Sequence, residues 1–470
     1  MMKLTYISLR VKTVQLLVIL IGMFLNSCDK FLDEKSDGAL AVPNTLKDLQ
    51  ALLDNNSTIN LYTGPGLIEL NTDDFFLEAS VLNKLTEFDK QAYTWHPNPQ
   101  FQLINVGLQW RNCYQVIFYA NTVLDHLNAV ENKNTVEYNS LKGFALFLRA
   151  YTYFQLAQVY APVYQPGDET HNMQKLGLPL RLDPSFEEKS HRSSIIETYD
   201  QILKDLHEAK ALLPETVAFA TRSNKTAAYA LLARVYLTMQ NYEQALSNAN
   251  EALTRNSTLM DYSMRNTAST TPFETFNPEV IFWAHSASMS MLSPTRANVD
   301  TVLYNSYGDN DLRKKVFFNK KTNGFVAFKG NYAGYYSSSF FNGLAVDEQF
   351  LIKSECLARL NKISEAKTTL TTLLSMRYAG AYNFPAVYSS QEEVLRYILQ
   401  ERRKELLFRG VRWSDIRRLN QDDRFKRNLT RILTDGSETK KFTLPVRDLR
   451  FTFIIPQDVI RTSGMTQNPR

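Results

Sequence analysis

The sequence predicts a mainly α-helical fold in which helical hairpins stack on one another, with an irregular, loop-rich part that carries short strands. Three observations lead to this prediction. Apolar residues recur at helical spacing over residues 107–213, two later stretches share one helix–turn–helix pattern, and residues 256–345 interrupt that pattern. With 470 residues, of which 44% are hydrophobic, the chain is long enough to bury a full core.

The first 28 residues have the features of an export signal. A short basic region precedes the apolar run Val14–Leu25, which is too short to span a bilayer but suits a secretory signal. Leu25-Asn26-Ser27-Cys28 then resembles the lipobox of bacterial lipoproteins. We therefore expect residues 1–27 to be a lipoprotein signal peptide and Cys28 to receive the lipid that anchors the protein. A secreted protein without lipid, or an uncleaved anchor helix, is the alternative.

The net charge argues against a nucleic-acid partner. The formal charge is +5, but Lys3, Arg10 and Lys12 lie in the predicted signal peptide, which contains no acid. The mature chain therefore carries about +2 (5 − 3), and it contains no long block of Lys and Arg.

Helical periodicity defines most of the elements that follow. Residues 28–43 predict a tether, which is polar over Asp29–Asp37. Residues 44–55 predict a first helix that begins at Asn44-Thr45. Residues 56–106 show weak periodicity and predict a structured loop region. Longer helices are expected over 107–127 and 141–160. Another begins at Ser194, with Glu197 completing a capping box, and ends at Leu213-Pro214.

Two stretches match the tetratricopeptide repeat, a helical hairpin of about 34 residues. The first unit starts at Thr226 and places large and small residues where two paired helices need them: Tyr229, Leu232, Ala233, Tyr236, Ala245, Ala249 and Ala252. A looser unit starts near Asp347 and includes Phe350, Ser354, Leu357, Ala366, Leu370 and Leu373. We therefore expect a superhelical scaffold over about 107–255 and 345–420. Between the units, Val280–Trp283 predicts a short strand.

The residues give little sign of catalysis. The six His residues are dispersed, and we find no metal-binding pair, phosphate-binding loop or nucleophile elbow, so no cofactor, metal or catalytic residue is predicted. Cys113 and Cys356 are interpreted as buried apolar residues, with a disulfide as the alternative. The charged motif Glu401–Glu405 is interpreted as structural, with its two Glu residues paired to Arg402, Arg403, Arg409 and Arg412.

Several motifs, in this order, resemble the SusD/RagB family of outer-membrane nutrient-binding lipoproteins. They run from Cys28-Asp-Lys-Phe-Leu-Asp33 through Trp110-x₃-Tyr114-x₂-Ile117-x₂-Ala120-Asn121, Leu148-Arg149-Ala150-Tyr151 and Lys225–Leu237 to Glu401–Arg418, Ile455-Pro456 and Gln467-Asn468-Pro469. The chain departs from the family at Arg409, where Glu is frequent, so the local ion pairs must differ.

The resemblance implies a cell-surface protein of the outer membrane that is not an enzyme. Residues 44–470 would form one SusD-like domain whose helical scaffold docks on a SusC-like TonB-dependent transporter. The ligand, most often an oligosaccharide and in some relatives a peptide, would bind in the irregular part at about 56–106 and 256–345.

Sugars present apolar faces to aromatic rings and hydroxyls to polar groups, and both loop regions supply such residues. The expected ligand contacts are Asp73, Asp74, Phe76, Trp95, Tyr304, Tyr307 and Tyr335. For each residue the alternative is a packed or merely exposed side chain, and for the two Asp residues it is a solvated turn. Trp283 is expected in the core.

Two further classes of function compete with capture of a glycan or peptide. A surface hydrolase would need a clustered nucleophile and base, which the sequence does not show. A purely structural repeat protein would have an aromatic-poor insertion, whereas residues 300–340 are rich in Tyr and Phe. The identity of the ligand, and whether a structural ion is bound, are left open.

Overall fold

The computed structural model describes residue 43 and residues 45–61, 63–97, 99, 101, 103–133 and 135–470, without the side chains of 103–108. The predicted signal peptide, Cys28 and all of the predicted tether except residue 43 lie outside the described residues, as does Asn44. Leu46–Arg470 forms one compact unit. Within the described ranges no helix is long and apolar enough to cross a membrane.

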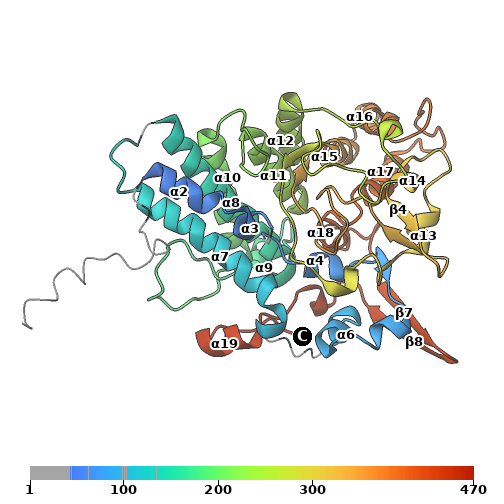
Figure 1. Ribbon diagram of the computed structural model, residues 1–470, viewed down its shortest axis with the longest axis horizontal. Helices are drawn as coiled ribbons and strands as arrows, with labels where there is room; N and C mark the ends of the chain where they lie inside the picture. Colours follow the sequence, from blue (N-terminus) through green and yellow to red (C-terminus); the bar gives the residue numbers. More distant parts are fainter. Residues whose placement is uncertain are drawn as a thin grey trace, which may run out of the picture. The chain divides into compact units, whose positions relative to one another are not determined.

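Five long helices form the first half of the scaffold. Each packs against a helix before or after it, as in α7 on α8, α8 on α10, α10 on α11 and α11 on α12 (Figure 1). The capping box of Ser194 and Glu197 starts α10 as predicted, and Thr135 caps α8 by accepting from the Tyr138 amide. The bounds of the five helices are α7 Leu103–Leu127, α8 Val136–Tyr160, α10 Ile195–Leu212, α11 Lys225–Thr238 and α12 Tyr242–Arg255.

Both predicted repeats are confirmed as helical hairpins. The first is α11–α12, and the second is α15 (Val346–Arg359) with α16 (Ile363–Ser375). Ala233, Ala245 and Ala249 are fully buried, because small side chains let the paired helices approach closely. The two hairpins stack through α12 and α15, and α17 (Gln391–Glu405) packs on α15. The mainly helical, tetratricopeptide-like fold is therefore confirmed.

The first loop region contains more regular structure than the sequence indicates. The predicted first helix is confirmed as α2 Leu46–Leu53. The short helices of the loop region are four to seven residues long, which is too short to produce a clear periodicity. They are α3 Asn56–Ile59, α4 Leu67–Leu70, α5 Ala79–Leu82 and α6 Glu87–Tyr93. The later helices are α9 Glu169–Gln174, α13 Thr301–Asn305, α14 Arg313–Val316, α18 Arg412–Leu419 and α19 Gln457–Ser463, with 3₁₀ turns at Tyr262–Met264, Ser290–Leu292 and Leu449–Phe451.

The described strands form four antiparallel pairs. The pair β1–β3 joins the first loop region to the second, with Phe75 opposite Val299, and β2–β6 joins the two ends of the second loop region. A longer hairpin, β7–β8, projects from the body (Figure 1). The bounds are β1 Phe75–Phe76, β2 Val280–Phe282, β3 Asn298–Val299, β4 Phe318–Lys320, β5 Val326–Phe328, β6 Leu344–Ala345, β7 Leu429–Asp435 and β8 Glu438–Leu444.

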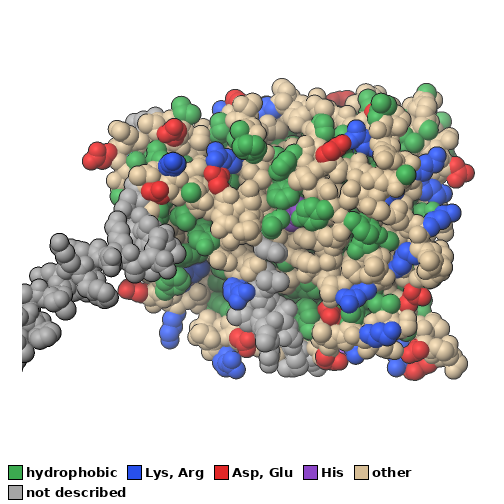
Figure 2. Space-filling model, viewed as in Figure 1, with side chains coloured by type: hydrophobic (Ala, Val, Ile, Leu, Met, Phe, Trp, Pro, Cys, Tyr) green, Lys and Arg blue, Asp and Glu red, His purple; other side chains and the backbone are tan. Residues whose placement is uncertain are grey.

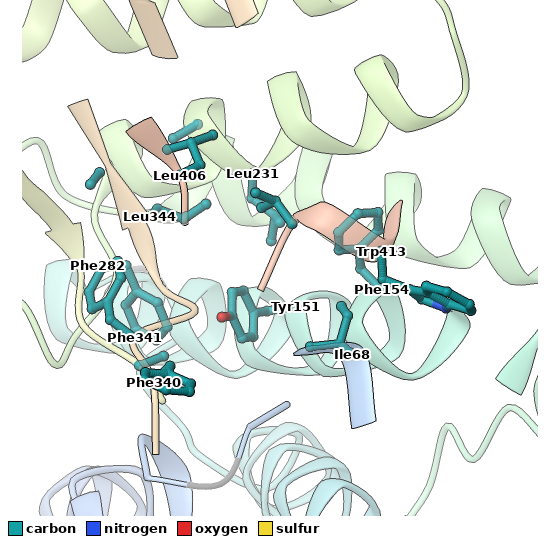
Figure 3. Packing of buried hydrophobic residues seen from close by; sticks show 14 of the residues in the cluster. Ile68, Tyr151, Phe154, Leu231, Phe282, Phe340, Phe341, Leu344, Leu406 and Trp413 are labelled. Carbon is teal, nitrogen blue, oxygen red and sulfur yellow. The ribbon is translucent and has the colours of Figure 1, made fainter. Parts of the chain in front are cut away.

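The scaffold and the irregular part share one core. Tyr151 of α8 lies with its ring 5.5 Å from that of Phe282 in β2, and Figure 3 shows both rings beside Phe341. The Tyr151 hydroxyl donates to the carbonyl of Asn342 at 2.7 Å. The loop-rich part is therefore held rigidly on the helices.

The charged motif Glu401–Glu405 is buried, which confirms its structural interpretation, but its predicted ion pairs are wrong. Glu401 pairs with Arg313 and Lys404, and Glu405 pairs with Arg313 and Arg377. Helical spacing does not reveal Arg313 and Arg377, which the fold brings from distant parts of the chain. The four arginines named from sequence pair elsewhere: Arg402 with Asp415, Arg403 with Asp74, Arg409 with Asp347 and Arg412 with Asp73.

Candidate functional site

Three of the predicted ligand contacts are buried, which corrects the prediction of one shared platform. Asp74 and Tyr307 have no exposed surface, and Trp95 is 5% exposed. The Tyr307 hydroxyl donates to the Lys404 carbonyl at 2.8 Å, and the Arg431 guanidinium lies 4.4 Å from the Trp95 ring centroid. These aromatic rings pack in the core rather than on a ligand face.

The Asp73 side chain is only partly exposed and forms ion pairs with arginines. It accepts from Arg412 Nε at 2.9 Å and also pairs with Arg403 and Arg427. Burial raises the pKa of Asp73, but the guanidiniums of Arg412 and Arg403 outweigh burial and hold the pKa below its ordinary value. The structure therefore supports neither prediction for this residue, a ligand contact or a freely solvated turn. It shows Asp73 within a cluster of ion pairs.

The other three predicted residues remain partly exposed, in separate surroundings. The Phe76 ring makes an edge contact with Phe325 at 5.0 Å, and the Tyr304 ring makes one with Phe318 at 5.2 Å. Tyr335 is 36% exposed and its hydroxyl hydrogen-bonds to His285 Nδ1. Of these three, Tyr335 continues into a row of neighbouring rings.

This row, here named the Tyr335 surface, is a ladder of four rings. The ring centroids are 5.0 Å apart from Tyr335 to His285, 4.2 Å from His285 to Trp283 and 5.5 Å from Trp283 to Phe276. Only the two end rings reach solvent, with Phe276 at 52% and Tyr335 at 36% exposed; the middle rings are buried, with Trp283 at 7% and His285 at 0%. The prediction that Trp283 lies in the core is confirmed, and its ring supports the exposed ones.

The local backbone explains why Trp283 and His285 lie on one face. The chain stays extended beyond β2, so side chains two residues apart point the same way. The Trp283 amide donates to the Ala220 carbonyl at 2.8 Å and the His285 amide donates to the Asn60 carbonyl at 2.7 Å. The two-residue spacing of Trp283 and His285, within the segment from Phe282 to His285, is the sequence signal that could have identified this face.

Serine and asparagine side chains flank the rings. Ser288 and Ser338 share a hydrogen bond of 2.7 Å between their hydroxyls at the exposed edge. The Asn331 amide donates to the carbonyls of Tyr335 and Ser339, at 3.2 and 3.0 Å, which fixes the loop that carries Tyr335. On the face shown in Figure 2, hydrophobic side chains gather in the middle of the molecule with polar groups around them.

The Tyr335 surface carries no charge at neutral pH. Burial lowers the pKa of His285 to about 3, so its imidazole is neutral. Neutral rings bordered by hydroxyls can stack on an apolar ligand face and exchange hydrogen bonds with hydroxyls.

Among the residues that the structure describes, no group of three or more His, Cys, Asp or Glu could hold a metal ion. Cys113 and Cys356 are both buried and no disulfide joins them, which confirms their interpretation as buried residues.

Comparison with known families identifies the family that has this architecture. Residues 30–237 match a family model described as starch-binding associating with outer membrane, and residues 296–470 match the model of the SusD family. The chain belongs to the SusD/RagB family. Phe276, Trp283 and His285 lie between the two matched regions, so the family pattern gives no information about these three rings.

Individual SusD-like relatives are distant. A SusD-like protein P2 from Formosa agariphila is 28% identical over 149 residues, a match that covers 31% of this chain and 26% of the relative. A SusD superfamily protein from Bacteroides thetaiotaomicron is 21% identical with a TM-score of 0.70, over 91% of this chain and all of that one.

Two further solved structures share the fold. A putative sugar binding protein from Bacteroides vulgatus is 19% identical with a TM-score of 0.71, over 91% of this chain and 99% of that one. A laminarin-binding SusD-like protein is 18% identical with a TM-score of 0.64, over 90% and 97% of the two chains.

Proposed function

We propose that this SusD-like chain is a cell-surface lipoprotein that captures an oligosaccharide on the Tyr335 surface and delivers it to a TonB-dependent outer-membrane transporter. The observation that carries the proposal is the ring ladder, which is exposed at Phe276 and Tyr335, neutral, and bordered by serine hydroxyls. The sugar-binding and laminarin-binding names of relatives that share the fold support a glycan ligand.

Capture, rather than catalysis, suits the chemistry of the site. Its rings and hydroxyls offer stacking and hydrogen bonds but no charged acid or base. The acids singled out from sequence, Asp73 and Asp74, are paired with arginines. Cys28, as the lipid anchor at the outer membrane, and the transporter partner belong to the same proposal. They rest on the lipobox and on the family description that mentions association with the outer membrane.

The test is calorimetric titration of the chain with neutral oligosaccharides derived from starch and laminarin. A lost aromatic contact removes on the order of 1 kcal/mol, so Tyr335→Ala and Phe276→Ala should each weaken binding several-fold. The matched control is Phe186→Ala, which removes an equally large exposed ring, 84% exposed, from the segment between α9 and α10. Circular dichroism verifies the fold of each variant.

Two outcomes would count against the proposal. Unchanged glycan affinity in both ladder variants would place the site elsewhere. Binding of mixed peptides, with no binding of any glycan, would replace the oligosaccharide by a peptide as the captured nutrient.

A further inference from the structure

A groove lined by cations lies between α17 and α18, apart from the Tyr335 surface. Its volume is about 380 Å³, and none of the residues that line it is acidic. Arg396 and Arg403 are two turns apart on α17, so both project from one face of that helix. The cations of this basic groove are Arg396, Arg403, Arg412, Arg424, Lys426 and Arg427.

Each cation has a carboxylate partner within the described chain, so the groove is not a bare positive patch. Arg396 pairs with Glu392 at 2.6 Å, and Arg424 pairs with Asp422 at 2.7 Å. Lys426 pairs with Asp423, and Arg403, Arg412 and Arg427 all pair with Asp73. What the basic groove offers a ligand is therefore its unused donors rather than excess charge.

Those donors are numerous. In Arg396, Arg403, Arg412 and Arg424 the hydrogen bonds run through Nε and Nη2, and Nη1 has no hydrogen-bond partner among the residues that the structure describes. Asn420, which also lines the groove, is 2% exposed, and its Nδ2 likewise lacks a partner within the described ranges. Of these donors only Asn420 Nδ2 is buried, and an unsatisfied buried donor favours a ligand that supplies an oxygen acceptor.

Two of the guanidiniums are held in place before any ligand arrives. The Cζ atoms of Arg396 and Arg424 lie 5.0 and 5.2 Å from the ring centroid of Phe425, and Arg396 Nη2 donates to the Arg424 carbonyl at 2.9 Å. Side chains that are already ordered lose less conformational entropy on binding. Planar guanidiniums match carboxylate and sulfate oxygens in a bidentate geometry.

We propose that the basic groove is a second glycan site, selective for acidic oligosaccharides, whose carboxylate or sulfate groups bind the free guanidinium donors. The volume is in the range of small-ligand pockets, and the Asn420 amide can serve the neighbouring hydroxyls. An acidic peptide is the alternative ligand for an arginine cluster, and hexaglutamate represents it in the test. The inference rests on the proposed capture of oligosaccharides.

The test is calorimetric titration of the chain with trigalacturonate, neutral maltotriose and hexaglutamate at low and high salt. Arg396 and Arg424 are each nearly half exposed, so the double variant Arg396→Gln/Arg424→Gln should fold normally. Each lost charge-assisted hydrogen bond lowers affinity by about tenfold. We expect trigalacturonate to bind at least tenfold more weakly to this variant, and its affinity for the unaltered chain to fall with salt.

The matched control is Lys440→Gln/Lys441→Gln, which removes the same charge from exposed positions of the β7–β8 hairpin and should leave trigalacturonate binding unchanged. Equal trigalacturonate affinity in the groove variant and the unaltered chain overturns the inference, as does tighter groove-dependent binding of hexaglutamate. If trigalacturonate affinity is unchanged in the groove variant while maltotriose binding still depends on Tyr335, the inference fails and the proposed function stands.

Discussion

Arg377 links three parts of the fold, and its replacement tests whether the buried ion network holds the irregular part on the scaffold. Its side chain has no exposed surface. Nε donates to Glu405 Oε1 at 2.6 Å, Nη2 donates to Glu279 at 2.8 and 2.9 Å, and Nη1 donates to the Met260 carbonyl at 2.7 Å. Arg377→Met keeps much of the volume but leaves two buried carboxylates with one cation fewer.

Removing one partner of a buried ion pair costs about 3–5 kcal/mol, because the remaining charge stays desolvated. Glu405 retains Arg313 at 3.0 Å, so most of the loss should arise at Glu279. Burial already raises the pKa of Glu279 to about 7, even though Arg377 lowers it. A raised pKa means that the folded state loses stability as pH rises above the unfolded pKa, so the deficit should grow from pH 6 to pH 8.

Urea denaturation at both pH values measures the loss. The control Arg396→Met breaks an exposed pair with Glu392, one helical turn away, and should cost only about 0.3–0.5 kcal/mol. An Arg377→Met variant as stable as this control, at either pH, would refute the reasoning that the network fastens the irregular part.

Three further predictions concern the anchor, the scaffold and the loop region. Cys28→Ala should abolish lipid labelling and release the protein from membranes; retention after a carbonate wash would contradict the lipobox interpretation. Ala233→Phe should lower the free energy of unfolding by about 1–3 kcal/mol or more through overpacking, and an unchanged melting temperature would show that α11 and α12 are not closely packed. Burial, offset by the Gly410 amide, raises the pKa of Glu69 to about 8. The chain should therefore lose on the order of 1.4 kcal/mol per pH unit between about pH 4.5 and 8, and Glu69→Gln should flatten that slope in denaturation curves.

The scaffold could be predicted from sequence because its determinants are local. The capping box at Ser194 and the small residues of α11 and α12 act over one or two helical turns, and each is found where predicted. The short helices α3 to α5 could not be predicted, since four residues make barely one turn. Their formation depends on packing against the rest of the core.

The candidate site was only partly predictable, because exposure is a property of the tertiary structure. Tyr335 and Tyr307 look alike in the sequence, yet one is 36% exposed and the other is fully buried under α17 residues. The sequence predicts a polar turn at Asp73, but its arginine partners come from positions more than 320 residues later. Ion pairs between residues far apart in the chain produce no periodic pattern in the sequence.

A structure of the chain in complex with a neutral oligosaccharide that it binds tests the central claim most directly. We predict a sugar ring stacked on Phe276 or Tyr335, with hydroxyls within hydrogen-bond distance of Ser288 or Ser338. A sugar bound on another face, with the four-ring ladder left untouched, would contradict the proposed site.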